Sequence, residues 1–407
     1  MFAASTGARL LRFMRPTWLR LQRAAVVLAG VIGFFVFAPA RTRAQSMEIP
    51  VSAQQWILSQ KNFKIPEEEP PRQNGEIVKH LGRQSFRLSR GLAYAKGVAL
   101  QNGTIDVDMA VDEKTRFLGL AFHVQSDDEY EVIFFRPRSS GTTQAVQYTP
   151  GMRGANVWQL YTGPGYTAAA EIPRNRWIHI RIIIAGTVAK LFLDNGTEPT
   201  LIVTDLKLGQ VEGSIGFWGH LGGGYFSNLT ITPDKTVYSS EVKQDFLPGA
   251  LTDWELSEMF DPREKKQTVY PNTLKLNWEK VSAEPPGMVV INRFRRSPNV
   301  DTPEREDRIR GLMPGAKFVF ARTKIHSDRD QVLRMKIGYS DEVVLFLNRV
   351  PLYTGKNGLG FRQGNFLGLL DIESDAVYLP LKEGDNELML AVTEFFGGWG
   401  FLCQLSP

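Results

Sequence analysis

Two side chains in this sequence have the types and the spacing of an acid/base pair. His123 and Glu131 lie on either side of the polar stretch 125–128, and a short hairpin there would bring the imidazole close to the carboxylate. Histidine exchanges protons near neutral pH, so it often serves as a general acid or base. His123 and Glu131 are therefore the catalytic candidates if the protein is an enzyme. A purely structural histidine is the alternative.

Paired acidic residues form a second group of candidates. Asp106 and Asp108 alternate with apolar residues, which places both carboxylates on one face of a strand, roughly 6–7 Å apart. That separation is close to the one that retaining glycosidases use, and a solvated outer face is the alternative. The turn at Asp127 and Asp128 offers oxygen ligands that would suit calcium, or it is a plain solvated loop. No histidines stand at a metal-binding spacing, so no metal ligand and no other cofactor is assigned.

Aromatic side chains gather in the expected loops and strand ends of the same region. Sugar rings pack their C–H faces on indole and phenol rings, while arginine and glutamine donate hydrogen bonds to hydroxyl groups. These side chains therefore predict a carbohydrate site, unless a β-sandwich buries them in its core. The candidates for contacting a glycan are Arg136, Gln147, Tyr148, Trp158 and Tyr161.

Short strands must position all of these side chains. Apolar residues alternate with other residues along 104–111, 117–124 and 177–184, which is the period of a half-buried strand. Asp194-Asn195-Gly196 stands between two apolar runs and indicates a tight hairpin. Many short strands separated by glycine and asparagine turns predict an antiparallel sandwich or barrel. A second β-rich region follows, with strand candidates at 278–281, 289–292, 317–320, 332–337, 342–347, 376–381 and 387–392.

We therefore expect an all-β protein made of two antiparallel β-sandwiches, or jelly rolls, in series after an N-terminal signal segment. No internal repeat relates the two halves. The expected divisions are a signal peptide or anchor at 1–44, an approach segment at 45–83, a first sandwich at 84–235, a linker at 236–249 and a second sandwich at 250–407.

The positive charge of the chain is concentrated at its N-terminus. The 407 residues include 48 Lys and Arg against 43 Asp and Glu, and the sequence pI is about 9.1. Residues 1–44 hold seven arginines and no acid, so the remainder has 41 bases and 43 acids. A nearly neutral remainder gives no electrostatic reason to expect nucleic-acid binding.

The arginine-rich start precedes an uninterrupted apolar run at 24–37, which small residues follow at 38–40 and 42–44. This order is typical of a secretory signal, with an uncleaved membrane anchor as the alternative. In both cases we expect an exported protein, periplasmic or extracellular, that contacts the membrane only through this segment if it is uncleaved. The only cysteine, Cys403, excludes an intramolecular disulfide, which fits a bacterial periplasm better than animal secretion.

Several of these strands carry a family resemblance. The first half contains GTIDVD at 103–108, FLGLAF at 117–122, YEVIFFRP at 130–137, QAVQY at 144–148, GSIGFW at 213–218 and GYFSNL at 224–229. With these motifs, residues 84–232 resemble the concanavalin A-like lectin/glucanase sandwich, particularly its laminin-G-like and 3-keto-disaccharide hydrolase-type branch. The second half contains DEVVLFLN at 341–348, LKEGDNEL at 381–388 and GGWGF at 397–401. With these, residues 317–405 more loosely resemble a galactose-binding-like jelly roll.

The resemblance implies a protein that handles carbohydrate, although fold alone does not establish activity. The Glu-x-Asp-x-x-Glu motif of the glucanases is absent, so the preferred function is glycan binding through the concanavalin A-like domain. The alternative is a glycoside hydrolase or lyase acting on (3-keto) disaccharides, with His123 and Glu131 as its acid/base candidates. A further alternative is a cell-envelope interaction module without a sugar ligand.

Overall fold

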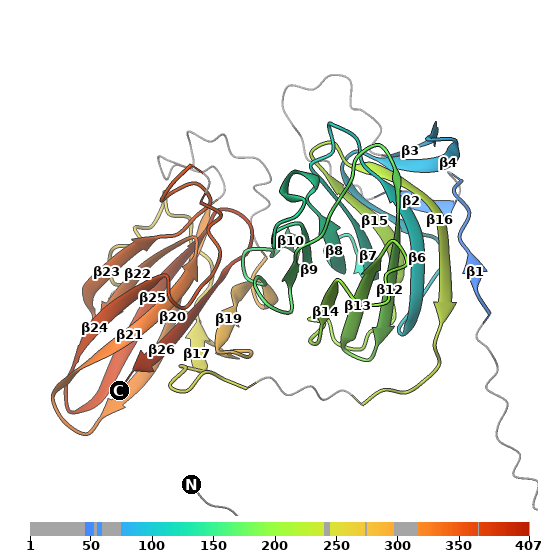
Figure 1. The fold of residues 1–407 in the computed structure, drawn as a ribbon. Coiled ribbons are helices and arrows are strands. Elements are labelled where there is room, and N and C mark those ends of the chain that lie inside the picture. The colour runs from blue at the N-terminus through green and yellow to red at the C-terminus, as the bar shows by residue number, and fades with distance from the viewer. Residues whose placement is uncertain are drawn as a thin grey trace, which may run out of the picture. The chain divides into compact units, whose positions relative to one another are not determined.

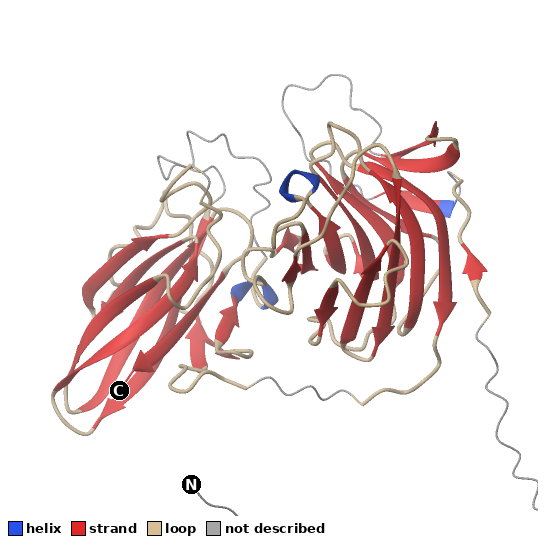
Figure 2. Cartoon of the chain, viewed as in Figure 1, coloured by secondary structure: helices blue, strands red, loops and turns tan. Residues whose placement is uncertain are grey.

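The protein is built almost entirely from strands. The computed structural model describes residues 45–52, 55–58, 75–239, 245–272, 275–296, 316–364 and 366–406 (Figure 1). Short 3₁₀ turns such as Pro137–Ser139 interrupt the strands (Figure 2). The predicted all-β fold class is confirmed. The expected signal segment at 1–44 lies outside the described residues, and among those described no helix has the length and apolar character to cross a bilayer.

The first sandwich consists of two eight-stranded antiparallel sheets, which we call sheet 1 and sheet 2. Sheet 1 has the order β14-β13-β12-β6-β16-β4-β3, with β1 paired to β16, and sheet 2 has the order β10-β9-β8-β7-β15-β5-β2, with β11 paired to β9. The strands of sheet 1 are β1 (Met47–Glu48), β3 (Gly75–His80), β4 (Arg83–Leu88), β6 (Gly103–Ala110), β12 (Trp177–Ala185), β13 (Val188–Leu193), β14 (Leu201–Val203) and β16 (Gly224–Pro233). Those of sheet 2 are β2 (Trp56–Leu58), β5 (Gly91–Ala95), β7 (Phe117–Ser126), β8 (Glu129–Phe135), β9 (Val146–Met152), β10 (Ala155–Asn156), β11 (Thr167–Ala168) and β15 (Ser214–His220).

Alternation along the strands decides which side chains enter the core between these sheets. In β6, Val107 and Met109 are buried against residues of sheet 2 such as Phe217, whereas Asp106 and Asp108 project from the opposite face. Two sheets packed across one apolar core form the architecture that the resemblance to concanavalin A-like sandwiches implied. The segment 45–83, which we expected only to lead into the sandwich, contributes β1, β2 and β3 to the two sheets.

The second sandwich pairs a six-stranded with a four-stranded antiparallel sheet. Its core contains Trp254, Trp399 and Phe401, which are all buried. Together the described strands of both sandwiches belong to one compact unit, residues 44–407. The six-stranded sheet contains β18 (Glu279–Ser282), β17 (Asp253–Leu256), β20 (Lys317–Ser327), β25 (Gly384–Glu394), β22 (Glu342–Leu347) and β23 (Val350–Lys356), and the four-stranded sheet contains β19 (Met288–Val290), β26 (Gly400–Ser406), β21 (Gln331–Ser340) and β24 (Asp375–Leu381).

Candidate functional site

The β7–β8 hairpin brings His123 and Glu131 into contact, as their spacing predicts. The Nδ1 atom of His123 lies 2.7 Å from Oε2 of Glu131, and its Nε2 atom lies 2.9 Å from the carbonyl oxygen of Gln101. His123 has a φ of 50° where the register of the hairpin shifts, so a β-bulge redirects its side chain. Both side chains are completely buried.

Glu131 belongs to a hydrogen-bond network inside the first sandwich. Its Oε1 atom accepts hydrogen bonds from the hydroxyl of Tyr148 at 2.8 Å and from the backbone N–H of Leu208 at 3.1 Å. Burial and the Glu131 carboxylate raise the pKa of Tyr148 well above its ordinary value. A general acid or base must come within hydrogen-bond reach of its substrate. Because His123 and Glu131 are both completely buried, a substrate cannot reach either side chain in this structure.

The other predicted sugar contacts also meet one another, but mainly as packing. Gln147 Nε2 donates to the carbonyl oxygens of Trp158 and Tyr161, at 2.7 and 2.6 Å, and its Oε1 atom accepts from Arg136. The Arg136 guanidinium lies 4.6 Å from the ring centre of Phe134 and 5.6 Å from that of Trp158, and burial lowers its pKa to about 10.

Burial limits what these residues offer to a ligand. Gln147, Tyr148 and Tyr161 are fully buried, whereas Arg136 and Trp158 keep part of their surface exposed. The fully buried rings present no open face on which a sugar ring could pack, because neighbouring side chains occupy that space. Burial in the core of the sandwich is the alternative to a carbohydrate site that the sequence left open for these side chains.

Accessible aromatic and charged side chains gather instead on the outer face of sheet 1. Register places Trp177 of β12 and Tyr225 of β16 on either side of Ala110 in β6, so a small residue separates two rings. The imidazole of His80 stacks on Tyr225, with ring centres 3.6 Å apart and planes 3° from parallel, and meets Trp177 edge-on at 5.9 Å. All three rings remain partly exposed, which makes this aromatic group a surface that a flat ligand can reach.

A charged row adjoins the aromatic group on the same face. His179 stands opposite Asp108 in the sheet; its Nδ1 atom lies 2.9 Å from Asp108, and its Nε2 atom lies 3.1 Å from Asp106. Arg181 contacts Asp106 at 2.7 Å, and Arg83 contacts Asp108 at 2.5 Å. The two aspartates keep less than a fifth of their side-chain surface exposed, whereas the two arginines keep 46% and 41%. The row therefore presents hydrogen-bond donors that ion pairs hold in place.

The β3–β4 hairpin completes this face. Leu81 and Gly82 both have positive φ values, of 44° and 79°, as a tight two-residue hairpin turn requires. The turn places His80 beside Tyr225, and the guanidinium of Arg83 lies 5.1 Å from the ring centre of Trp177. Trp177 Nε1 also donates to the Leu81 carbonyl oxygen at 3.4 Å. These contacts attach the hairpin to the sheet, so the aromatic and charged groups share one rigid surface.

Of the residues on this face, only the two aspartates are site candidates from the sequence. Asp106 and Asp108 lie on an outer face, but each carboxylate already contacts histidine and arginine side chains, which makes them positioning groups rather than a free catalytic pair. His80, Arg83, Trp177, His179 and Tyr225 were missed. The alternating pattern of 177–184 located β12 and was the available signal for Trp177 and His179, whereas nothing local connects His80 to Tyr225.

Within the described ranges, no three His, Cys, Asp or Glu side chains are grouped as a metal site would require. The turn at Asp127 and Asp128, our calcium candidate, instead contributes Asp128 to an ion pair with Arg296 at 2.5 Å. Calcium binding at this turn stays a prediction.

Comparisons with known proteins find resemblance in structure but not in sequence. No protein-family model matches the chain, and no curated protein matches it. The carbohydrate-binding module CBM66 from Bacillus subtilis is 16% identical over 39% of this chain and 92% of its own, with a TM-score of 0.30. The Caenorhabditis elegans galectin LEC-6 is 9% identical over 44% of this chain and 99% of its own, with a TM-score of 0.23.

A third solved structure is the exoplasmic/lumenal domain of VIP36, in a form bound to Ca²⁺ and Man3GlcNAc. It is 12% identical over 48% of this chain and 91% of its own, with a TM-score of 0.32. At this level of similarity nothing follows for the ligand of the present chain.

Proposed function

We propose that this protein is an exported glycan-binding protein and that it binds sugar on the outer face of sheet 1. The observation that carries the proposal is the partly exposed aromatic group of His80, Trp177 and Tyr225 beside the ion-paired row that contains Arg83 and His179. Sugars have apolar C–H faces and polar hydroxyl edges, and this surface offers a matching group for each.

The rigidity of this surface supports the proposal. The side chains stand on neighbouring hydrogen-bonded strands, and Asn228 adds a hydrogen bond of 2.8 Å to Asp108. Binding then orders few side chains, which reduces the entropic cost of capturing a weakly interacting ligand. Each donor atom is also held at a defined place relative to the rings, which favours one sugar orientation over another.

Replacing Trp177 by alanine is expected to weaken glycan binding at least tenfold, about 1.4 kcal/mol, because the largest ring of the aromatic group is lost. The measurement is a glycan-array screen followed by calorimetric titration of the best oligosaccharide. Trp278→Ala is the matched control, since Trp278 is a partly exposed tryptophan of the second sandwich, also beside an arginine. The affinity of the Trp278→Ala variant for the same oligosaccharide should stay within twofold of the parent value.

Two results would contradict the proposed site. An equal loss of affinity in both tryptophan variants would show a general effect on folding. The absence of any array signal at millimolar sugar would favour the interaction module without a sugar ligand.

The export part of the proposal rests on the arginine-rich start and the apolar run at 24–37. We expect the protein recovered from its cells to begin after Ala40 or Ala44, where the small-x-small sequences end. Mass spectrometry of the N-terminal peptide measures this directly. An intact Met1 in the membrane fraction would contradict cleavage and indicate an anchor, whereas an intact Met1 in the cytosol would contradict export.

A further inference from the structure

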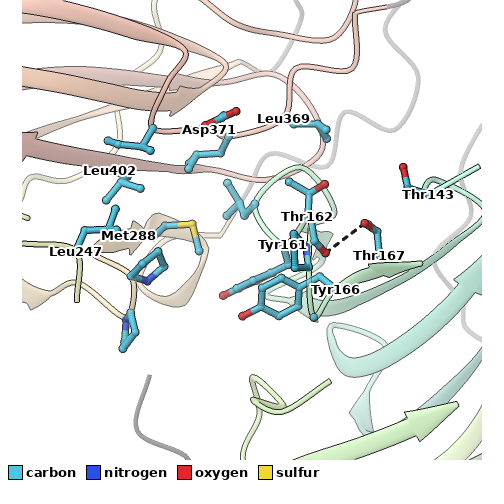
Figure 3. A pocket seen from close by; sticks show the side chains of 18 of the residues that line it. Thr143, Tyr161, Thr162, Tyr166, Thr167, Leu247, Met288, Leu369, Asp371 and Leu402 are labelled. Atoms are coloured by element: carbon cyan, nitrogen blue, oxygen red, sulfur yellow. Dashed lines mark hydrogen bonds between the residues drawn. The ribbon is translucent and has the colours of Figure 1, made fainter. Parts of the chain in front are cut away.

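A cavity of about 950 Å³ lies where loops of the first sandwich meet the second sandwich. Its volume falls within the range of small-molecule sites, and its walls come from separate parts of the chain. Figure 3 shows Tyr161, Tyr166 and Thr162 on one side of this pocket and Met288 and Leu402 on the other. The pocket is distinct from the outer face of sheet 1, because it shares no residue with that face.

The two walls of the pocket differ in chemistry. The wall from the first sandwich carries hydroxyl groups, aromatic rings and a Gly-Pro-Gly turn. The wall from the second sandwich is mainly aliphatic. The first wall includes Tyr161, Thr162, Tyr166 and Thr167, and the second includes Leu247, Met288, Ile372 and Leu402.

Contacts between the two sandwiches hold the two walls at their present separation. The Tyr161 hydroxyl donates to Oε1 of Glu284 at 2.7 Å, and Gln159 Nε2 donates to the carbonyl oxygen of Leu367 at 2.7 Å. Leu160 of the first sandwich joins Met288 and Leu402 of the second in one apolar cluster that forms part of the pocket lining. The cavity is therefore preformed in the compact unit and does not require either wall to move before a ligand enters.

A buried lysine contacts the two tyrosine rings of the first wall. The Nζ atom of Lys207 lies 4.9 Å from the ring centre of Tyr161 and 5.5 Å from that of Tyr166, and this side chain is almost completely buried. Cation–π contacts fix both rings in place. Tyr166, unlike Tyr161, keeps part of its surface open, so its ring is the one that can pack against a ligand.

We propose that this pocket binds an amphipathic glycan, namely a sugar that carries an alkyl or acyl chain. The sugar lies against Tyr166 and the threonine hydroxyls of the first wall, and the chain lies against the aliphatic second wall near Ile372. A free sugar would leave the aliphatic second wall in contact with water, and a plain hydrocarbon would make no hydrogen bonds with the threonine hydroxyls of the first wall, so a ligand with both parts matches the pocket best.

The test compares octyl β-glucoside, below its micelle-forming concentration, with methyl β-glucoside by calorimetric titration of the full-length protein. The two probes share a sugar and differ in the chain. We expect octyl β-glucoside to bind at least tenfold more tightly. Equal affinity for the two probes would overturn the proposal.

Variants distinguish the pocket from other apolar surfaces. Ile372→Ser should weaken octyl β-glucoside at least fivefold and leave methyl β-glucoside unchanged, whereas Ile202→Ser, at an exposed isoleucine of β14, should change neither. Leu247→Ser provides a second variant of the same wall if Ile372→Ser unfolds. Unchanged octyl β-glucoside affinity in a folded wall variant would overturn the proposal, because the probe would then bind elsewhere on the protein.

The sugar wall has its own test. Tyr166→Ala should lower the affinity for both probes. Tyr166→Phe should keep most of the parent affinity, since the phenylalanine ring retains the packing surface. Trp177→Ala should leave octyl β-glucoside binding intact. This last result separates the pocket from the sugar site proposed on sheet 1, so that either can fail alone.

Discussion

Replacing Glu131 by alanine is expected to lower the free energy of unfolding by about 3–5 kcal/mol. Three groups lose their acceptor together, namely the imidazole of His123, the hydroxyl of Tyr148 and the backbone N–H of Leu208. Because the side chains of His123 and Glu131 are fully buried, water cannot replace the carboxylate unless the sandwich opens. Urea denaturation followed by tryptophan fluorescence measures the loss.

Glu131→Gln is the matched variant, and its outcome follows from the protons. In this variant Nε2 of His123 can still donate to the Gln101 carbonyl oxygen, and Nδ1 can then accept instead of donate. A glutamine amide can donate to Nδ1 while its oxygen still accepts from Tyr148 and Leu208. We therefore expect Glu131→Gln to remain within about 1 kcal/mol of the parent. Equal losses of unfolding free energy in the glutamine and alanine variants would contradict this expectation and show that the charge of Glu131 stabilises the network.

Glu284→Ala is expected to have a comparable effect at the contact between the two sandwiches, about 3–5 kcal/mol. Glu284 lies 2.6 Å from Arg293 and 3.2 Å from Lys207, whose side chain is 3% exposed. It also accepts the hydrogen bond from Tyr161. Removing the carboxylate takes this partner from Arg293 and leaves Asp205, at 2.5 Å, as the acidic partner of Lys207, so the cost of burying the Lys207 charge is less well offset.

The pH dependence of this variant has a defined sign. Burial opposes the ionisation of Glu284, but the charges of Lys207 and Arg293 outweigh it and hold the pKa below its ordinary value. The carboxylate therefore contributes stability above about pH 4, and that contribution is lost as the pH falls through the lowered pKa. The difference in the free energy of unfolding between the parent and Glu284→Ala should have its full value at pH 7 and become smaller in strong acid.

A surface ion pair provides the control for Glu284→Ala. Glu373 pairs with Lys336 but keeps 61% of its side chain exposed, so Glu373→Ala should change the free energy of unfolding by less than about 1 kcal/mol. Similar losses in the two variants, or a difference from the parent that does not depend on pH, would contradict the role assigned to Glu284.

The strands were predictable because their signal is local. Alternating apolar residues at 104–111 and 177–184 correspond to β6 and β12, and the strands expected in the second half correspond to β18, β19, β20, β21, β22, β24 and β25. The short strands β1 and β2 could not be recognised in the same way, since each has too few residues to show a period.

The site was predictable only where its residues are close in the sequence. A hairpin joins His123 to Glu131, so their contact follows from the turn between them. Their burial does not follow, because it depends on chain segments that cover sheet 2 and on partners such as Leu208. Trp177 and Tyr225 become neighbours through β6, which pairs with both of their strands.

By itself, the sequence determined the all-β class, most of the strands and which residues share one face of each strand, because alternation is a property of a few consecutive residues. Only the tertiary structure decided which faces are open. It buried Tyr148 and Tyr161, left Trp177 and Tyr225 partly accessible and formed a pocket beside Tyr166. The physical reason is that exposure depends on what packs against a face, and those partners come from distant parts of the chain.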